Sequence, residues 1–183
     1  MDASLSTRAS GCTKCDLSLT RQRVVVGSGS YSSALVIVGE APGRAEDEGG
    51  APFIGRSGQL LFRLIFDELG LTREQCYVTN VVKCRPPANR TPTRHEIAAC
   101  RGWLDEQVSL MSAPVILTLG NTATRAVCQR RDPISKVRGT VIELDHARVV
   151  PTFHPAAALR GGPSVVIMMR ADLRVVDELL RSP

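Results

Sequence analysis

Four short apolar runs, each followed by a helical pattern, constrain the fold of this chain more than any other feature. The runs span residues 35–39, 77–82, 115–119 and 149–153. The first and third are continuous in Val, Ile and Leu, which is typical of strands buried on both faces of a parallel sheet. Residues 137–144 and the region around Arg148 are compatible with an added hairpin. The sequence therefore predicts an α/β domain whose sheet is mostly parallel.

Helical patterns separate and follow these runs. They span residues 58–69, 93–108, 121–127 and 164–180. Gly70 follows the first as a C-terminal stop, and Thr93 with Glu96 opens the second in a capping-box pattern. Asn121 or Thr122 would cap the third helix. The alternation of strand and helix supports the α/β interpretation.

The length of 183 residues predicts one domain spanning 1–183. Residues 1–33 precede the first apolar run and form a polar appendage that needs an anchor of its own. The longest uninterrupted apolar runs have five residues, whereas a membrane helix needs about 20. The N-terminus has no apolar signal-peptide region. We therefore expect a cytoplasmic protein without membrane association.

The charge balance is basic. The chain has a formal net charge of +5, and 20 of its 23 basic residues are arginine. Arginine forks onto phosphates better than lysine does, so a polyanionic partner is compatible with this composition. A coding bias toward arginine explains the same count equally well. The charge favours a nucleic-acid partner without establishing one.

The chain has six cysteines, and in a reducing compartment these are more often metal ligands, catalytic groups or buried fillers than disulfides. Cys12 and Cys15 form a C-x2-C pair in the polar appendage, while Cys84 and Cys100 flank the loop after the second strand. Four thiolates from two distant segments complete a tetrahedral metal site or hold an iron–sulfur cluster. Alternatively, the first pair binds a metal and the second pair fills the core. The other two cysteines are interpreted as packing residues.

Three polar side chains stand where three of the predicted strands end. Glu40 follows the first strand, Asn80 lies near the end of the second, and His154 follows the fourth. Each alone has an ordinary structural explanation: a loop carboxylate, a bracing amide, a structural histidine. Because the carboxyl ends of parallel strands meet at one edge, where α/β proteins bind ligands, we expect one shared site. Phe53 is a candidate stacking platform for a flat ring beside it.

Three sequence blocks carry a family resemblance. They read GEAPGRAEDEGGAPFIGRSGQLL at 39–61, TNVVKCRPPANRTP at 79–92 and TFHPAAALR at 152–160. Together with the cysteines, they resemble the type-4 uracil-DNA glycosylases, the iron–sulfur members of the uracil-DNA glycosylase superfamily. The resemblance implies a three-layer α/β/α sandwich with a four-stranded, mostly parallel sheet. It also implies a structural [4Fe–4S] cluster that anchors residues 1–33 and is held by Cys12, Cys15, Cys84 and Cys100.

The resemblance further implies a monofunctional enzyme of base excision repair. Such an enzyme flips uracil out of DNA and hydrolyses its N-glycosidic bond, leaving an abasic site without cutting the strand. His154 would stabilise uracil O2 as negative charge develops there, and Glu40 would orient water or stabilise the cationic sugar. Leu159 and Arg160 would contact the DNA and fill the emptied stack.

Four residues would bind the base itself. Phe53 would stack on the uracil face, and Asn80 would pair with the polar edge through its donor and its acceptor. The backbone of Ala41 would line the pocket, and Glu46 would face uracil C5, where thymine carries its methyl group. The expected partner is uracil-containing DNA, single- or double-stranded, bound by a monomer.

Two departures from related patterns bear on the mechanism. A sister group captures uracil covalently through a histidine in a basic insertion after the second strand. The segment from Cys84 to Thr93 has no such insertion, and His95 lies within the expected helix, so covalent capture is not expected. Ala156 stands where many relatives carry serine, which puts a hydroxyl contact to DNA phosphate in doubt.

The main alternative is a noncatalytic nucleic-acid-binding module with a structural metal. It explains the arginines and cysteines but leaves Glu40, Asn80 and His154 as coincidences. A third interpretation takes the GEAPG turn as a phosphate loop. It is weak because the turn lacks both the G-x-G-x-x-G pattern and the P-loop lysine.

Overall fold

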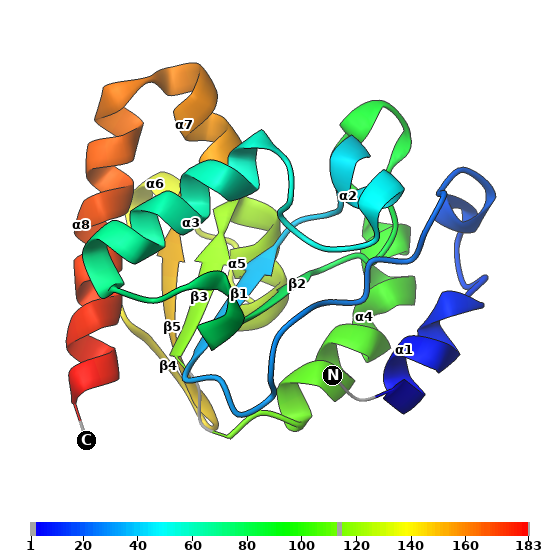
Figure 1. Ribbon diagram of the computed structural model, residues 1–183, viewed down its shortest axis with the longest axis horizontal. Helices are drawn as coiled ribbons and strands as arrows, with labels where there is room; N and C mark the ends of the chain where they lie inside the picture. The colour runs from blue at the N-terminus through cyan, green and yellow to red at the C-terminus, as the bar shows by residue number, and fades with distance from the viewer. Residues whose placement is uncertain (1–2, 113–114, 183) are drawn as a thin grey trace.

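The computed structural model describes residues 3–112 and 115–182, and its centre is a five-stranded sheet (Figure 1). The strands are β1 (Leu35–Gly39), β2 (Cys76–Asn80), β3 (Val115–Leu119), β4 (Ile142–Leu144) and β5 (Ala147–Thr152). Their order is β2-β1-β3-β5-β4. The first four in this order are parallel, and β4 pairs antiparallel with β5. The predicted α/β class with a mostly parallel sheet is confirmed.

The expected number of four strands is wrong, because the hairpin before the last strand adds β4 at the edge. This strand has three residues, and only Ile142 is buried, so its sequence carries too little periodicity to identify it alone. The second strand also ends earlier than its apolar run. After Asn80 the chain turns away, and the N–H groups of Val81 and Val82 donate to the carbonyls of Gly39 and Glu40.

Helices cover both faces of the sheet. They are α1 (Ala3–Ser10), α2 (Arg44–Gly49), α3 (Arg56–Leu69), α4 (Arg94–Ser109), α5 (Gly120–Cys128), α6 (Ile134–Val137), α7 (Pro155–Gly161) and α8 (Pro163–Arg181). Along β1, Val36 and Val38 belong to the core that includes α1, α4 and α5. Leu35 and Ile37 belong to the opposite core, with α3 and α8. Strand β1 is therefore buried on both faces, as its continuous apolar sequence predicts.

A local signal accounts for the start of α4 but not for that of α5. The Thr93 hydroxyl accepts from the Glu96 N–H at 3.2 Å, and the Glu96 carboxylate accepts from the Thr93 N–H at 2.7 Å, as the capping-box pattern predicts. The predicted cap of α5 is wrong, because this helix begins at Gly120 without a side-chain cap. Asn121 instead accepts from the Ile134 N–H at 2.8 Å, and Thr122 donates to Glu40.

Residues 3–33 wrap around the edge of the sheet at β2 (Figure 1). Leu5 and Leu17 are buried in the core shared with α4. Ser28 and Val78 exchange two backbone hydrogen bonds of 2.9 and 2.8 Å, which add one antiparallel bridge to β2. The segment is thus anchored by apolar packing and by strand-edge pairing. Among the described residues, no helix is long and apolar enough to cross a membrane.

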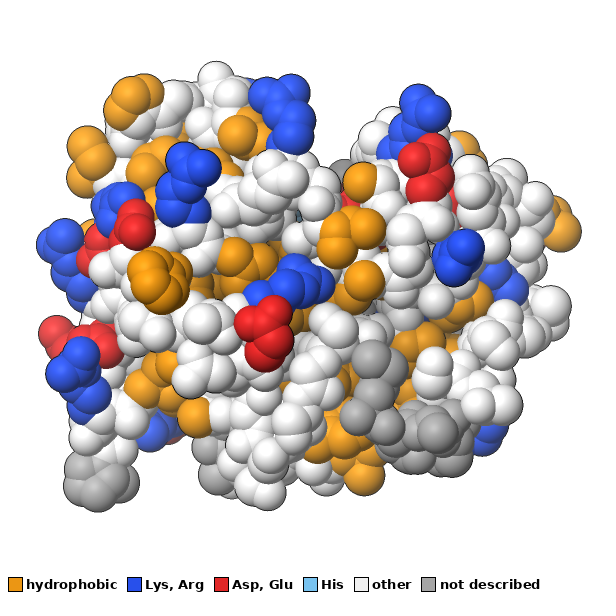
Figure 2. All heavy atoms as spheres, in the orientation of Figure 1, with side chains coloured by type: hydrophobic (Ala, Val, Ile, Leu, Met, Phe, Trp, Pro, Cys, Tyr) orange, Lys and Arg blue, Asp and Glu red, His pale blue; other side chains and the backbone are white. Residues whose placement is uncertain are grey.

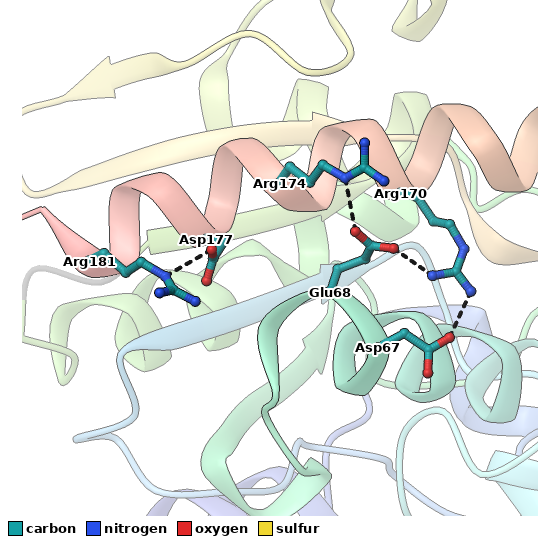
Figure 3. Close-up of polar contacts among 6 residues, drawn as sticks. All are labelled: Asp67, Glu68, Arg170, Arg174, Asp177 and Arg181. Carbon is teal, nitrogen blue, oxygen red and sulfur yellow. Dashed lines mark hydrogen bonds and ion pairs between the residues drawn. The ribbon is translucent and has the colours of Figure 1, made fainter.

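Ion pairs clamp α8 onto α3 (Figure 3). The Arg170 guanidinium contacts Asp67 at 2.7 Å and also Glu68, while Arg174 contacts Glu68 at 3.0 Å. These arginines lower the pKa of Glu68. The groups are partly exposed, so we expect water to weaken the pairs.

A second ion pair of α8 is buried. The carboxylate of Asp172, 1% exposed, accepts from Arg138 at 2.6 and 3.1 Å and from the Thr152 hydroxyl at 2.6 Å. It joins α8 to the end of β5 and to the segment before β4. Burial nevertheless raises the pKa of Asp172.

We predict that Asp172→Asn destabilises the fold much more than Glu68→Gln. The first change leaves the mostly buried Arg138 guanidinium without its counter-charge, at a cost of about 3 kcal/mol. The second weakens a surface cluster, at a cost of about 0.5–1 kcal/mol. Urea unfolding of both variants measures the difference, and equal losses would contradict the distinction.

Candidate functional site

A cleft of about 750 Å³ opens at the carboxyl edge of the parallel strands. Its lining includes residues that follow three of these strands, namely Glu40 after β1, Gly120 after β3 and His154 after β5, together with Asn80 at the end of β2. Figure 2 shows the molecule hollowed between the part that carries α7 and the part that carries α2, with basic side chains on both sides. The polar residues expected to share a site thus line one cleft.

Asn80 presents a buried acceptor that has no donor. The residue is 1% exposed, and its Oδ1 is the only buried side-chain nitrogen or oxygen of the described residues that lacks a hydrogen-bond partner. The parallel register places Asn80 opposite Gly39. A Cβ at Gly39 would lie 2.4 Å from both Asn80 Oδ1 and Phe53 Cζ. Because buried acceptors are almost always paired in native proteins, this oxygen is suited to an N–H of a ligand.

Phe53 is held in a conformation that costs free energy. Its φ is +53°, in the left-handed region that bulky residues avoid. The Arg73 guanidinium donates to the Phe53 carbonyl at 3.0 Å and also to the Pro52 carbonyl. Gly58 lets α3 pass close by, since a Cβ there would lie 1.9 Å from the Phe53 oxygen. These contacts direct the Phe53 ring toward His154, with centroids 6.0 Å apart.

His154 is neutral and its tautomer is defined by the backbone. It precedes α7, and its Nδ1 accepts from the Ala156 N–H at 3.1 Å. Since a backbone N–H only donates, Nδ1 is unprotonated and the neutral ring carries its proton on Nε2. Burial, helped by the positive charge of Arg160 and opposed by Glu46, lowers the pKa of His154 to about 4. The ring therefore offers the cleft one N–H donor near pH 7.

Two carboxylates line the same cleft with different partners. Glu40 accepts from the hydroxyl of Thr122 on α5. Glu46, in α2, is 8% exposed and accepts from the N–H of Gly43 at 3.1 Å and from that of Gly55 at 2.8 Å. Glu46 thus ties the turn after β1 to the loop that carries Phe53. Ala41 lines the cleft between them.

The two expected DNA-contact residues lie on α7 and differ in position. Arg160 lines the cleft, whereas Leu159 is 45% exposed and is not part of its lining. Two further arginines line the cleft, Arg125 on α5 and Arg90 in the loop before α4. Arg90 donates to both oxygens of Glu96 at 2.9 and 2.6 Å, and this contact lowers the pKa of Glu96 to about 2.

The four cysteines predicted as ligands line one small pocket, although they come from distant segments. N–H groups reach three of their sulfur atoms. Trp103 Nε1 donates to Cys12 Sγ at 3.5 Å, Arg21 to Cys84 Sγ at 3.4 Å, and the backbone N–H of Lys83 to Cys100 Sγ at 3.3 Å. Donors of this kind stabilise sulfur atoms that carry negative charge.

The ionisable groups around this pocket have displaced pKa values. Burial raises the pKa of Cys84 to about 11 and also raises that of Cys100, so a bound metal must displace protons from both thiols. Burial lowers the pKa of Lys83 to about 7, against the opposing effect of Cys100 and Cys84. Within residues 3–112 and 115–182, no three His, Cys, Asp or Glu side chains are grouped closely enough for a single metal ion.

Several residues that shape the site escaped sequence analysis. Thr122 and Arg73 act through contacts with Glu40 and Phe53, 82 and 20 residues away in the chain. Gly39 was visible only as part of a glycine-containing turn. The buried Lys83 had no distinguishing local pattern, although it lies directly before Cys84. His95, at the start of α4, is exposed and outside the cleft lining.

A family model and several relatives of known name all point to the same family. A model of the uracil DNA glycosylase superfamily matches residues 26–174. A type-4 uracil-DNA glycosylase of Thermotoga maritima is 48% identical over 158 residues, covering 85% of this chain and 82% of the relative. That of Sulfurisphaera tokodaii is 40% identical, covering 94% and 81%. A type-5 uracil-DNA glycosylase of Pyrobaculum aerophilum is 31% identical, covering 84% and 72%.

We predict that Gly39→Ala destabilises the protein by about 1–3 kcal/mol, because its methyl group overlaps Asn80 and Phe53. Gly102→Ala is the matched control. In the exposed middle of α4, a Cβ at Gly102 meets nothing within 4 Å, so this change should stabilise the helix by about 0.5–1 kcal/mol. Thermal unfolding compares the two, and a shift of the same sign in both would refute the packing argument.

We also predict that His154 stays neutral until the pH approaches 4. An unfolded histidine titrates near pH 6.5, so from there toward pH 4 only the unfolded chain binds this proton. The stability linked to neutral His154 is therefore complete above pH 6.5 and is lost as the pH falls through about 4. Nitrogen-15 NMR should show Nε2 protonated and Nδ1 bare, and a midpoint above pH 6 would contradict the assignment.

Proposed function

The chain belongs to the uracil-DNA glycosylase superfamily, and from this premise we propose how its cleft recognises and releases uracil. It is a type-4 uracil-DNA glycosylase and acts in DNA repair, as its relatives at 40–48% identity indicate. The substrate is uracil-containing DNA. The observation that carries the site assignment is the buried, unpaired Oδ1 of Asn80 beside the Phe53 ring.

Uracil fits this pair of side chains chemically. Its N3–H supplies the donor that Asn80 Oδ1 lacks, and the amide nitrogen of Asn80 donates to the adjacent uracil O4. Phe53 offers its ring to the face of the base. Such a pocket admits only a base that has left the stack, and extrusion costs a few kcal/mol, which these contacts offset.

Selection against thymine is assigned to Glu46 and the backbone at Ala41. Both line the cleft, and the Glu46 carboxylate is held on both sides by backbone N–H groups. A side chain fixed in this way occupies the space beside uracil C5 and leaves no room for a methyl group. The same hydrogen bonds hold the turn at Gly43 and the loop at Gly55 at a fixed distance from each other.

Bond breaking leaves negative charge on the uracil and positive charge on the sugar. A neutral His154 donates its Nε2–H to uracil O2, and the hydrogen bond strengthens as charge accumulates on that oxygen. Glu40, oriented by Thr122, stabilises the cationic sugar or orients the attacking water. Arg160 contacts the DNA backbone at the mouth of the cleft, and the exposed Leu159 fills the space that the base leaves.

The cysteine pocket fits a [4Fe–4S] cluster held by Cys12, Cys15, Cys84 and Cys100. All four line one pocket, yet they are not grouped tightly enough for a single ion among the described residues, as a zinc site requires. N–H donors already reach three of the sulfurs. When bound, the cluster supplies structure, because it ties residues 3–33 to α4 and to the loop before it.

The noncatalytic alternative accounts for less of the geometry. A module that only binds nucleic acid has no use for an unsatisfied buried amide oxygen or for a histidine held in one tautomer. Both features weaken or constrain a fold without helping it to bind phosphates. They are expected where a base is read and its departure assisted.

We predict that the protein makes uracil-containing DNA sensitive to alkali without cutting it directly. His154→Ala should lower the single-turnover excision rate about 100- to 1,000-fold, because its hydrogen bond is strongest in the transition state. Affinity for the same DNA should change little. His95→Ala is the control, since that histidine is exposed outside the cleft lining. DNA that remains resistant to alkali with the wild-type protein would rule out the glycosylase.

We predict that the purified protein contains iron and acid-labile sulfide in equal amounts, about four of each per chain. Cys84→Ala should lose both and lower solubility, whereas Cys128→Ala, a buried cysteine outside the pocket, should retain them. Metal analysis and visible absorption measure this. A colourless, zinc-loaded protein would contradict the cluster assignment.

A further inference from the structure

The side chain of Lys83 is buried, and no described residue gives it an acidic partner. The residue is 1% exposed, and its interactions among the described residues include no carboxylate. A buried ammonium is costly unless hydrogen bonds and an opposite charge compensate it. The uracil chemistry proposed above does not use this group. Its retention in the core therefore calls for another explanation.

The hydrogen bonds of Lys83 fit an ammonium group at Nζ. It lies 2.6 Å from the carbonyl of Asn80, 2.6 Å from Gln107 Oε1 and 2.8 Å from the Thr79 hydroxyl. The first two atoms only accept. Thr79 can donate its own proton to the Val26 carbonyl at 2.9 Å and so accepts from Lys83. Three acceptors match the three N–H groups of an ammonium.

The backbone of the same residue reaches the cysteine pocket. The Lys83 N–H donates to Cys100 Sγ at 3.3 Å, and its carbonyl accepts from Val25 of the N-terminal segment at 2.7 Å. Lys83 also lines the pocket itself. A single residue therefore contacts a cluster ligand through its main chain and the backbone of the base-reading Asn80 through its side chain.

We propose that Lys83 is a positioning residue that couples the cysteine site to the uracil-reading amide. Its ammonium fixes the main chain at Asn80, while its N–H and its positive charge stabilise the thiolates of the occupied pocket. This inference rests on the proposed cluster, in which four thiolates leave an excess of negative charge. Two other cations are near: Arg21 contacts Cys84, and Lys14 lines the pocket but is exposed to water.

The test compares Lys83→Met with Lys14→Met in the iron-loaded protein. Both changes remove one lysine charge beside the pocket, but only the first removes the contact with Asn80. One measurement is the half-life of the cluster's visible absorption in air with a chelator. The other is the ratio of affinities for two matched duplexes, one with a 2′-fluorinated, uncleavable deoxyuridine and one with thymidine.

For Lys83→Met we expect the cluster half-life to fall several-fold. The affinity ratio should fall about tenfold, as for the loss of one well-placed hydrogen bond, while binding to the thymidine duplex stays constant. Lys14→Met should change neither quantity by more than about twofold, because water screens its charge. Unchanged values for Lys83→Met, or equal effects of the two variants, would overturn the proposal.

Two outcomes distinguish a failure of the Lys83 proposal from a failure of the cluster assignment or of the uracil assignment. A wild-type protein without iron and sulfide overturns the coupling together with the cluster, and leaves the uracil assignment intact. If Lys83→Met does not fold, Thr79→Val replaces it, because this change removes one acceptor and keeps the ammonium. We then expect a few-fold lower affinity ratio with the wild-type cluster half-life, and an unchanged ratio overturns the proposal.

Discussion

The pairing of β1 with β2 is the constraint on which the site depends. Its parallel register sets Gly39 against Asn80, and the missing side chain at Gly39 lets Asn80 and Phe53 close over the strand end. The turn that follows carries Glu40, whose carbonyl accepts from Val82 beyond β2. A shift of one residue would turn Asn80 to the other face of the sheet. The geometry of the proposed base-reading site is therefore set by strand pairing, and the loops add to it.

The site also stores unfavourable free energy. Phe53 has a left-handed backbone, and Asn80 has an oxygen that no described residue pairs. His154 is kept neutral where free histidine would partly ionise. Each feature costs free energy in the free protein, and the proposed contacts with uracil would use all three. Packing elsewhere offsets the cost, notably in the two apolar cores beside the sheet.

Sequence patterns predicted the parts of the molecule that obey local rules. The continuous apolar runs identified the parallel strands, and Thr93 with Glu96 identified the start of α4. Their positions at the carboxyl ends of predicted parallel strands placed Glu40, Asn80 and His154 at one edge, and they line one cleft. The hairpin expected from residues 137–144 and the region around Arg148 is present, but the expected count of four strands left out β4, whose three residues carry no period. Arg73 and Thr122 were missed because their contacts join segments whose proximity only the tertiary fold determines.

The bridge between Ser28 and Val78 has a consequence for how the protein behaves in a crowded cell. Strand β2 ends the sheet on one side, and an uncovered edge strand is a template for pairing with another chain. Residues 25–28 lie along that edge and occupy some of its hydrogen-bonding groups. At the other side, β4 is too short to recruit a partner. The N-terminal segment, which also carries Cys12 and Cys15, thus covers part of the β2 edge and hinders its pairing with another chain.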